Sequence, residues 1–588
     1  MFCALAGPGY SPCSIRATPG ASMTYTPPVE EQRFLLRHVV GMEELAGHNA
    51  FAEASPDLVD AILEGAGAFA AGEFAPLNRI GDEVGAKWSP EGVTMPPGFR
   101  EAYRAYVEGG WGTLAGPPEH GGQGLPLALA TVVMEDLGSA NMGFSLCMML
   151  TPGTVEALRH HGSADLRAAW LPKLVTGEWT GTMNLTEPQA GSDVGALKTR
   201  AVPDGDGMYR ITGQKIFITY GEHDLADNIV HLVLARLPDA PQGTRGISLF
   251  LVPKILPDGT ANDLRCVSIE HKLGIHASPT CVMAYGDEGG AVGWLIGEEN
   301  KGMAAMFTMM NNARLNVGLQ GVSIAERAMQ QAVAYARERV QGSREGRPAR
   351  IIEYPDVRRM LLRMKALTQG ARALAYYCAG QTDRASLGDE DARARADLLT
   401  PLVKAYGTDV GVEVTGLAVQ VHGGMGYIEE TGAAQHVRDA RISPIYEGTN
   451  GIQAADLVGR KLGLEGGETL KRLLDEIRAE APGEGSLMAL VDDCEKVAEA
   501  LLAGPIDDRL AASYPFLTMM SVAVAGWLMA RQKAALAGHD GDPAFAAMKR
   551  AAARFYLEQI VPEAQGLKAA AMAPAELLYS LDEEAFAA

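Results

Sequence analysis

Hydrophobic and polar positions change their period twice along the chain. From Pro56 to Leu174, long Ala/Leu-rich runs place apolar residues at helical spacing, with breaks at Trp111-Gly112 and in the glycine-dense segment 117–126. Between 209 and 252 the pattern becomes short β-branched and aromatic runs bounded by Gly, Pro and Asp. Such runs predict strands, and we place a β-domain at about 181–297.

Helical spacing returns after Gly302 and continues towards the C-terminus. Helices are predicted within 317–339, 356–381 and 392–421, and a glycine-rich hinge at 463–467 separates them from a further helical stretch. The order helices, strands, helices predicts an α+β fold. The predicted segments are an over-extended start 1–22, an N-terminal extension 23–54, an N-terminal helical domain 55–180, a middle β-domain 181–297, a C-terminal helical domain 298–463 and an additional helical domain 464–588.

The longest uncharged stretch, Leu510 to Ala530, approaches the length of a membrane span. Pro515 is expected to split it, and polar residues and one glycine dilute its apolar character. We therefore predict a buried helix of a bundle in a soluble protein, with no membrane partner.

Composition narrows the function classes. The 588 residues are too many for one core, and 51 basic against 72 acidic residues give a net charge of −21, which argues against a nucleic-acid groove. The seven cysteines are scattered and show no CxxC spacing, and the sequence contains no HExxH motif. We therefore predict no metal site and a reduced, cytoplasmic setting. Residues 1–22 lack the basic and apolar regions of a signal peptide, and Met23 is a better start.

Three segments carry candidate chemistry: Met183–Asp193 (MNLTEPQAGSD), His422–Tyr427 (HGGMGY) and Ile445–Asn450 (IYEGTN). The first combines a glycine with short hydroxyls, which allows close backbone approach and hydrogen bonds to a ligand. In the third, Glu447 is a carboxylate on a Gly-Thr-Asn turn and is a candidate general base.

In this order the three segments resemble the acyl-CoA dehydrogenases, flavoenzymes that desaturate acyl thioesters between their α and β carbons. The resemblance extends from about Phe74 to Gly463. It implies FAD as the cofactor, flavin N5 as the hydride acceptor and an acyl-CoA substrate. It also implies a C-terminal domain of four helices and an electron-transfer flavoprotein as electron acceptor.

The resemblance assigns Glu447 as the base that removes the α proton. An ordinary glutamate pKa of about 4.3 suits a weak carbon acid poorly, and burial beside a flavin and an acyl chain would raise it. Some family members carry the base on a helix, just before an arginine. The matching position here is Ala313, which accepts no proton. The alternative for Glu447 is a capping role for a helix starting near Asn450.

The resemblance also implies the ligand contacts. Contacts to the flavin within one subunit fall on Met183, Leu185, Thr186, Ser192, Phe217 and Thr219. FAD contacts across a subunit boundary, and hence a homodimer, fall on Arg339, Gln420, Gly424 and Thr449. Ser192 and Arg314 would contact the substrate. The alternatives are an ordinary turn at 183–193, a plain strand with one buried aromatic at Phe217, and solvated helix charges at Arg314 and Arg339.

The chain start at 23–36 and the additional helical domain resemble a subgroup of longer members. These oxidise 3-(methylthio)propanoyl-CoA in dimethylsulfoniopropionate breakdown, or straight-chain fatty acyl-CoAs over a broad range. We expect the methylthio substrate first and a straight chain second, because a pocket distinguishes one methylene by only about 1–3 kcal/mol.

Two further classes are alternatives, an acyl-CoA oxidase and a DNA-binding flavoprotein. The acidic composition after Gly463 argues against the DNA-binding class. Because its apolar helix must bury its surface, we expect the additional domain to cover the face through which shorter relatives form tetramers.

Overall fold

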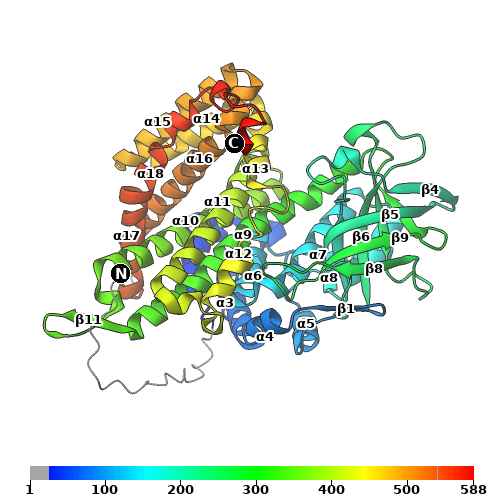
Figure 1. Ribbon diagram of the computed structural model, residues 1–588, viewed down its shortest axis with the longest axis horizontal. Coiled ribbons are helices and arrows are strands. Elements are labelled where there is room, and N and C mark those ends of the chain that lie inside the picture. Colours follow the sequence, from blue (N-terminus) through cyan, green and yellow to red (C-terminus); the bar gives the residue numbers. More distant parts are fainter. Residues whose placement is uncertain (1–24, 539–540) are drawn as a thin grey trace.

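The computed structural model describes residues 25–538 and 541–588. The proposed over-extended start, 1–22, and Met23 lie outside the described residues. One β-rich region follows a set of helices and precedes another, which confirms the predicted α+β class (Figure 1).

Helices dominate the N-terminal region. A short hairpin, β1 (Lys87–Ser89) with β2 (Gly92–Thr94), interrupts them and was not predicted from the sequence. The most buried members are α6 and α7, which pack against each other and against later helices. The helices are α1 (Val29–Leu35), α2 (Met42–Ala46), α3 (Pro56–Phe69), α4 (Leu77–Val84), α5 (Phe99–Glu108), α6 (Leu127–Ala140), α7 (Met142–His161) and α8 (Ala164–Thr176).

An eight-stranded sheet forms the middle region, as the alternating runs predict. Its strands follow the order β3-β6-β7-β10-β5-β9-β8, with β4 paired to β5. Only β3 and β6 run parallel, and the other pairs are antiparallel. The strands are β3 (Trp179–Asn184), β4 (Arg200–Gly205), β5 (Met208–Thr219), β6 (Asn228–Ala235), β7 (Ser248–Pro253), β8 (Leu264–Ile269), β9 (Thr280–Tyr285) and β10 (Ala291–Ile296).

Three long helices, α9 (Gly302–Glu338), α10 (Pro355–Ser386) and α11 (Glu390–His422), build the next region. Glycines allow α9 and α11 to cross closely: a Cβ on Gly321 would lie 1.9 Å from the carbonyl oxygen of Gly407. The hairpin β11 (Val340–Arg344) with β12 (Arg347–Arg350) was not predicted. Two short helices follow, α12 (Ala433–Ala440) and α13 (Asn450–Asp456).

The additional helices pack beside α10 and α11, above them in Figure 1. Arg363 of α10 forms ion pairs with Glu413 of α11 (2.5 Å) and with Glu563 of the additional region (2.8 Å). The hydroxyls of Tyr406 and Tyr556 lie 2.6 Å apart across the same contact. The helices are α14 (Glu468–Glu480), α15 (Gly485–Ala503), α16 (Ile506–Ala535), α17 (Pro543–Phe555), α18 (Val561–Gln565) and α19 (Lys568–Ala571).

Among the described residues, the helical segment Ile506–Gly538 alone has the length and composition to cross a membrane, and 83% of its most apolar window is buried inside the protein. This burial confirms the predicted bundle helix. The predicted break at Pro515 is wrong, because α16 continues through it. Phe516 and Leu517, directly after the proline, are fully buried, and their packing offsets the lost backbone hydrogen bond.

Buried charges join distant parts of the chain. Arg372 of α10 pairs with Glu135 of α6 (2.8 Å) and with Glu326 of α9 (2.7 Å). Lys549 of α17 pairs with Glu31 of α1 at 2.8 Å, and both side chains are buried. Removing one partner of such a pair leaves a buried charge uncompensated.

Candidate active site

Glu447 lies on a left-handed turn between α12 and α13. Its φ is 55° and that of Gly448 is 83°, so two successive residues adopt a backbone conformation that L side chains rarely take. The side chain of Gln453 holds the turn by donating to the carbonyl oxygens of Glu447 and Gly448, each at 3.3 Å. The hydroxyl of Thr449 caps α13 by accepting from the amide of Ile452, so Thr449, not Glu447, is the capping residue.

The surroundings of the Glu447 carboxyl suit a proton acceptor. Burial raises its pKa to about 7, although Lys404 and Arg314 act in the opposite direction. Among the described residues none donates a hydrogen bond to the carboxylate. The half-buried side chain is therefore available to a ligand.

Arg314 is not a solvated helix charge. Its side chain is 5% exposed and pairs with Asp456 of α13 at 3.1 Å. Asp456 also accepts from Arg460 at 2.6 Å, so the carboxylate is shared between two arginines. Ala313, next to Arg314, is buried and supplies no competing proton acceptor.

Some buried polar atoms near the Glu447 turn are available to bind a ligand. Within the described residues, Gln320 Nε2, Gln453 Oε1 and Arg314 Nε are buried without a hydrogen-bond partner. The opposite end of the Gln320 amide accepts from the hydroxyl of Tyr446, the neighbour of Glu447. Because unpaired buried polar groups are costly, these atoms indicate a place where a polar ligand completes the site.

Ion pairs fix the segment leading to Glu447 at the meeting point of three regions. Arg438 of α12 pairs with Asp82 of α4 at 2.5 Å, and His276, before β9, approaches the same carboxylate at 3.0 Å. The carboxylate of Asp439 accepts from the backbone amide of Ile275 at 2.5 Å. The N-terminal helices and the sheet region therefore both position α12.

The predicted flavin residues come together at one end of the sheet. Thr186 follows β3, and its carbonyl oxygen accepts from the amide of Ile216 on β5 at 2.9 Å. The next residue, Phe217, lies on a β-bulge with φ 60°, and its ring is 58% exposed. The hydroxyl of Thr182 donates to the carbonyl oxygen of Thr219 at 2.7 Å. Leu185 and Thr219 are half-buried beside this bulge.

Phe217 is not a plain strand aromatic. An exposed ring held on a strained bulge presents an apolar face for stacking, which fits an isoalloxazine ring. Met183 is buried on β3, whereas Ser192 is exposed on the following loop. A Cβ on Gly191 would meet nothing within 4 Å, which leaves room for a ligand at this loop.

Sequence reasoning missed the buried pair that shapes this loop. Lys215 Nζ donates to Glu187 Oε1 (2.8 Å) and to the carbonyl oxygen of Leu185 (3.0 Å). Glu187 also accepts from the amides of Lys198 (2.6 Å) and Thr199 (3.1 Å). Pairing with Lys215 outweighs burial and lowers the pKa of Glu187 to about 2. Glu187 lies inside the segment Met183–Asp193 and Lys215 lies on β5, and no local pattern shows that they meet.

Arg339, Gln420 and Gly424 form a separate group at the ends of α9 and α11. The rings of Tyr335 and His422 stack at 4.4 Å and bring these two helix ends together. All three predicted residues are exposed. Gln420 lies 16 residues beyond Lys404 on α11, about 24 Å along the helix axis. The group is therefore not part of the Glu447 site of its own chain, whereas Thr449 is next to Glu447.

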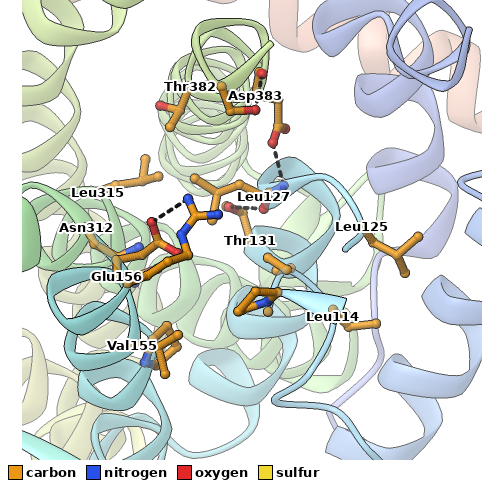
Figure 2. Close-up of a pocket in the computed structure, with 18 of the residues that line it drawn as sticks. Leu114, Leu125, Leu127, Thr131, Val155, Glu156, Asn312, Leu315, Thr382 and Asp383 are labelled. Atoms are coloured by element: carbon orange, nitrogen blue, oxygen red, sulfur yellow. Dashed lines mark hydrogen bonds and ion pairs between the residues drawn. The ribbon is translucent and has the colours of Figure 1, made fainter. Parts of the chain in front are cut away.

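A cavity of about 980 Å³ lies between α6, α7, α9 and the adjoining ends of α10 and α11 (Figure 2). Neither Glu447 nor any other predicted site residue lines it. On α9, Asn312 and Leu315 face this cavity, whereas Arg314 faces Asp456. At its rim, Asp383 accepts from the amide of Leu127 at the start of α6 (2.6 Å). The cavity is thus distinct from the candidate active site.

Comparison with protein families gives four matches in chain order. They are the acyl-CoA dehydrogenase N-terminal domain (residues 59–178), the middle domain (182–287), the C-terminal domain (300–463), and the acetyl-CoA dehydrogenase C-terminal like domain (471–582). The matched ranges include the segment Met183–Asp193, the Glu447 turn and the additional helices.

Full-length relatives agree with these matches. A Ruegeria pomeroyi protein named 3-methylmercaptopropionyl-CoA dehydrogenase is 46% identical, covering 92% of this chain and 97% of the relative. A butyryl-CoA dehydrogenase of Syntrophomonas wolfei is 36% identical, covering 96% and 100%. The structure of Caenorhabditis elegans ACDH-11 in complex with C11-CoA shares the fold, with a TM-score of 0.76 and 20% identity over 95% of this chain and 94% of that chain. The chain therefore belongs to the acyl-CoA dehydrogenase family of FAD-dependent oxidoreductases.

Proposed function

We propose that the protein introduces a double bond between the α and β carbons of an acyl-CoA thioester, with Glu447 as the base. The Glu447 carboxylate would take the α proton, and bound FAD would supply the acceptor for the hydride that leaves the β carbon. The observation that carries this proposal is the left-handed turn, which presents a half-buried carboxyl with a pKa raised to about 7 and with no hydrogen-bond donor among the described residues. A base with a pKa near the working pH is effective and still substantially ionised.

The proposed roles of the other residues follow from their environment. Leu185, Thr186 and Thr219 would offer polar groups at the flavin edge, Met183 would support them, and Phe217 would stack on the ring. Ser192 would reach the phosphate region and the substrate, and Arg314 would line the acyl-CoA channel. A partner subunit's FAD would contact Arg339, Gln420, Gly424 and Thr449, all of which are exposed in one chain.

We propose 3-(methylthio)propanoyl-CoA as the preferred substrate, which would place the enzyme in dimethylsulfoniopropionate degradation. The 46% identity to the Ruegeria pomeroyi relative over nearly the whole chain supports this choice. The second candidate is a straight-chain acyl-CoA, which the butyryl-CoA relative supports. Values of kcat/KM for methylthiopropanoyl-, butanoyl- and hexanoyl-CoA with an artificial electron acceptor decide between them. A clear preference for a straight chain overturns the first choice.

We further propose a cytoplasmic homodimer that passes its electrons to an electron-transfer flavoprotein. The dimer is supported by the group Arg339, Gln420 and Gly424, which lies too far from the chain's own Glu447 to serve the same flavin ring. Anaerobic reduction followed by exposure to air, compared with reoxidation by electron-transfer flavoprotein, separates a dehydrogenase from an oxidase. Rapid reoxidation by air alone contradicts the proposed acceptor.

The substitution Glu447→Gln tests the base directly, because it keeps the size of the side chain and removes the proton acceptor. Acyl-CoA added without oxygen should bleach the flavin of the wild type, and the rate should fall about 10²–10⁴-fold in the variant. FAD and acyl-CoA should still bind. Glu298→Gln, at an exposed position, is the matched control and should behave as the wild type. Bleaching of Glu447→Gln at the wild-type rate excludes Glu447 as the base.

A further inference from the structure

A chain of hydrogen bonds runs from the additional helical domain to the interior beside Glu447. The hydroxyl of Tyr514 on α16 donates to Asp409 Oδ2 of α11 at 2.7 Å. Asp409 Oδ1 accepts from Asn450 Nδ2 at 2.9 Å. Asn450 Oδ1 in turn accepts from Lys404 Nζ at 2.9 Å. The chain therefore crosses from the surface of α16 to a fully buried ammonium group.

Asn450 couples this chain to the Glu447 turn. It is the first residue of α13, three positions after Glu447, and its side chain is buried. Its side-chain Nδ2 also donates to the carbonyl oxygen of Ala405 and to the hydroxyl oxygen of Thr408, at 3.2 and 3.0 Å. The C-terminal end of the Glu447 turn is thus tied to α11.

Lys404 is a cation that no described carboxylate pairs with directly. Its exposed fraction is 0%, and among the described residues its one side-chain hydrogen bond is the one to Asn450. A buried ammonium group is costly unless a negative charge lies nearby. Burial lowers the pKa of Lys404 to about 7, and the nearby charges of Glu447 and Asp409 act against this shift, so Lys404 and the Glu447 carboxylate stabilise each other's ionised form.

We infer that Lys404 and Asn450 are positioning residues for Glu447, and that the additional domain supports them through the bond from Tyr514 to Asp409. This inference rests on the proposed role of Glu447 as the base. It gives the additional domain a part in the reaction besides covering α10 and α11.

Charged and titratable groups surround Lys404 and Glu447 on every element packed against them. They are Arg314 on α9, Lys404 and Asp409 on α11, Asp456 on α13, Tyr514 on α16, and Arg441, Tyr446 and Glu447 on the connecting segment. Lys404 and Arg314 favour the ionised carboxylate of Glu447. Asp456 pairs with Arg314 and limits its effect, whereas Lys404 is buried and has no direct carboxylate partner among the described residues.

Lys404→Met, which removes the charge and keeps much of the chain length, is the first test. The rate of flavin reduction by acyl-CoA should rise with pH, because Glu447 must be ionised. The acid limb is the part of the pH profile in which the rate rises. In the variant this limb should move to higher pH by about one unit, and the rate should recover at high pH. A merely structural role lowers the rate at every pH and leaves the limb in place.

Tyr514→Phe is the second test and removes one hydroxyl at the protein surface. Without this donor the ionised form of Asp409 is less stable, and the charged form of Lys404 is then less stable as well. The acid limb of the rate profile should therefore move to higher pH, by less than in Lys404→Met. Thr518→Val, one turn further on α16, is the matched control, because its hydroxyl bonds only to the carbonyl oxygen of Tyr514. It should leave the profile unchanged.

The outcomes separate this inference from the proposed base. If Glu447→Gln abolishes flavin reduction but the limbs of Lys404→Met and Tyr514→Phe coincide with that of the wild type, the inference fails alone. If Glu447→Gln reduces its flavin normally, the base assignment fails. Should Lys404→Met not retain FAD, Tyr514→Phe decides alone, and an unmoved limb in that variant overturns the inference.

Discussion

Two side chains proposed to meet the reacting groups are presented by left-handed backbone. Glu447 has a φ of 55° and Phe217 a φ of 60°, and neither is a glycine. Such conformations cost about 1–3 kcal/mol each and persist only where the surroundings impose them. Here the surroundings are Gln453, which holds the Glu447 turn, and the bulge between β5 and β9, which holds Phe217. The carboxyl and the ring are therefore both presented by strained backbone.

The pH dependence of the wild type follows from the environment of Glu447. Its pKa is raised to about 7, so the carboxyl is protonated below that pH and ionised above it. Because only the ionised form accepts the α proton, the rate of flavin reduction should fall about tenfold per pH unit below the limb. Stopped-flow measurements between pH 5.5 and pH 9 check this. A rate that is flat down to pH 5.5 contradicts the raised pKa.

At this scale, sequence motifs indicated the residues proposed to face the ligands but not those that support them. Glu447, Thr186 and Phe217 stand in segments whose local composition indicates chemistry. Lys404 and Asn450 are 46 residues apart and become partners only because α13 packs on α11. A buried lysine in a helix has no sequence signature, since its burial depends on which neighbouring helix covers it.

At the scale of elements, the crossing of α9 and α11 depends on glycine. Gly321→Ala would place a Cβ 1.9 Å from the carbonyl oxygen of Gly407, so the helices would have to move apart. We expect a loss of about 1–3 kcal/mol in the free energy of unfolding. Gly416→Ala on α11 meets nothing within 4 Å and should be neutral or stabilising by up to about 1 kcal/mol. Denaturant unfolding of both variants measures the difference, and equal stabilities contradict the close crossing.

The long helices and the strands β5, β6 and β7 could be predicted from their periods, whereas the other strands of the sheet, two hairpins and the course of α16 could not. β1 with β2 and β11 with β12 are each only a few residues per strand, too short for a period to show. Pro515 was expected to break α16, but the buried residues after it hold the helix together. At α16, tertiary packing thus outweighs the local helix-breaking signal of the proline.

At the scale of the whole molecule, the additional helices cover a face of α10 and α11 through Arg363, Tyr406 and Tyr556. We expect the full-length protein to be a homodimer, because this face is no longer available for a second pair of subunits. A chain ending at Gly463 should uncover buried surface and form larger species or aggregate. Light scattering of both proteins checks this, and a stable tetramer of the full-length protein contradicts the covering role.

The pair Glu31–Lys549 joins the first helix to the seventeenth across 518 residues of sequence. Both charges are buried, so each needs the other in the folded state. During synthesis Glu31 leaves the ribosome long before Lys549, and for that whole interval the first helix lacks the cation that compensates it. The contact between α1 and α17 can therefore form only once Lys549 has been made, whereas the contacts of α1 with α3 and α6 can form earlier.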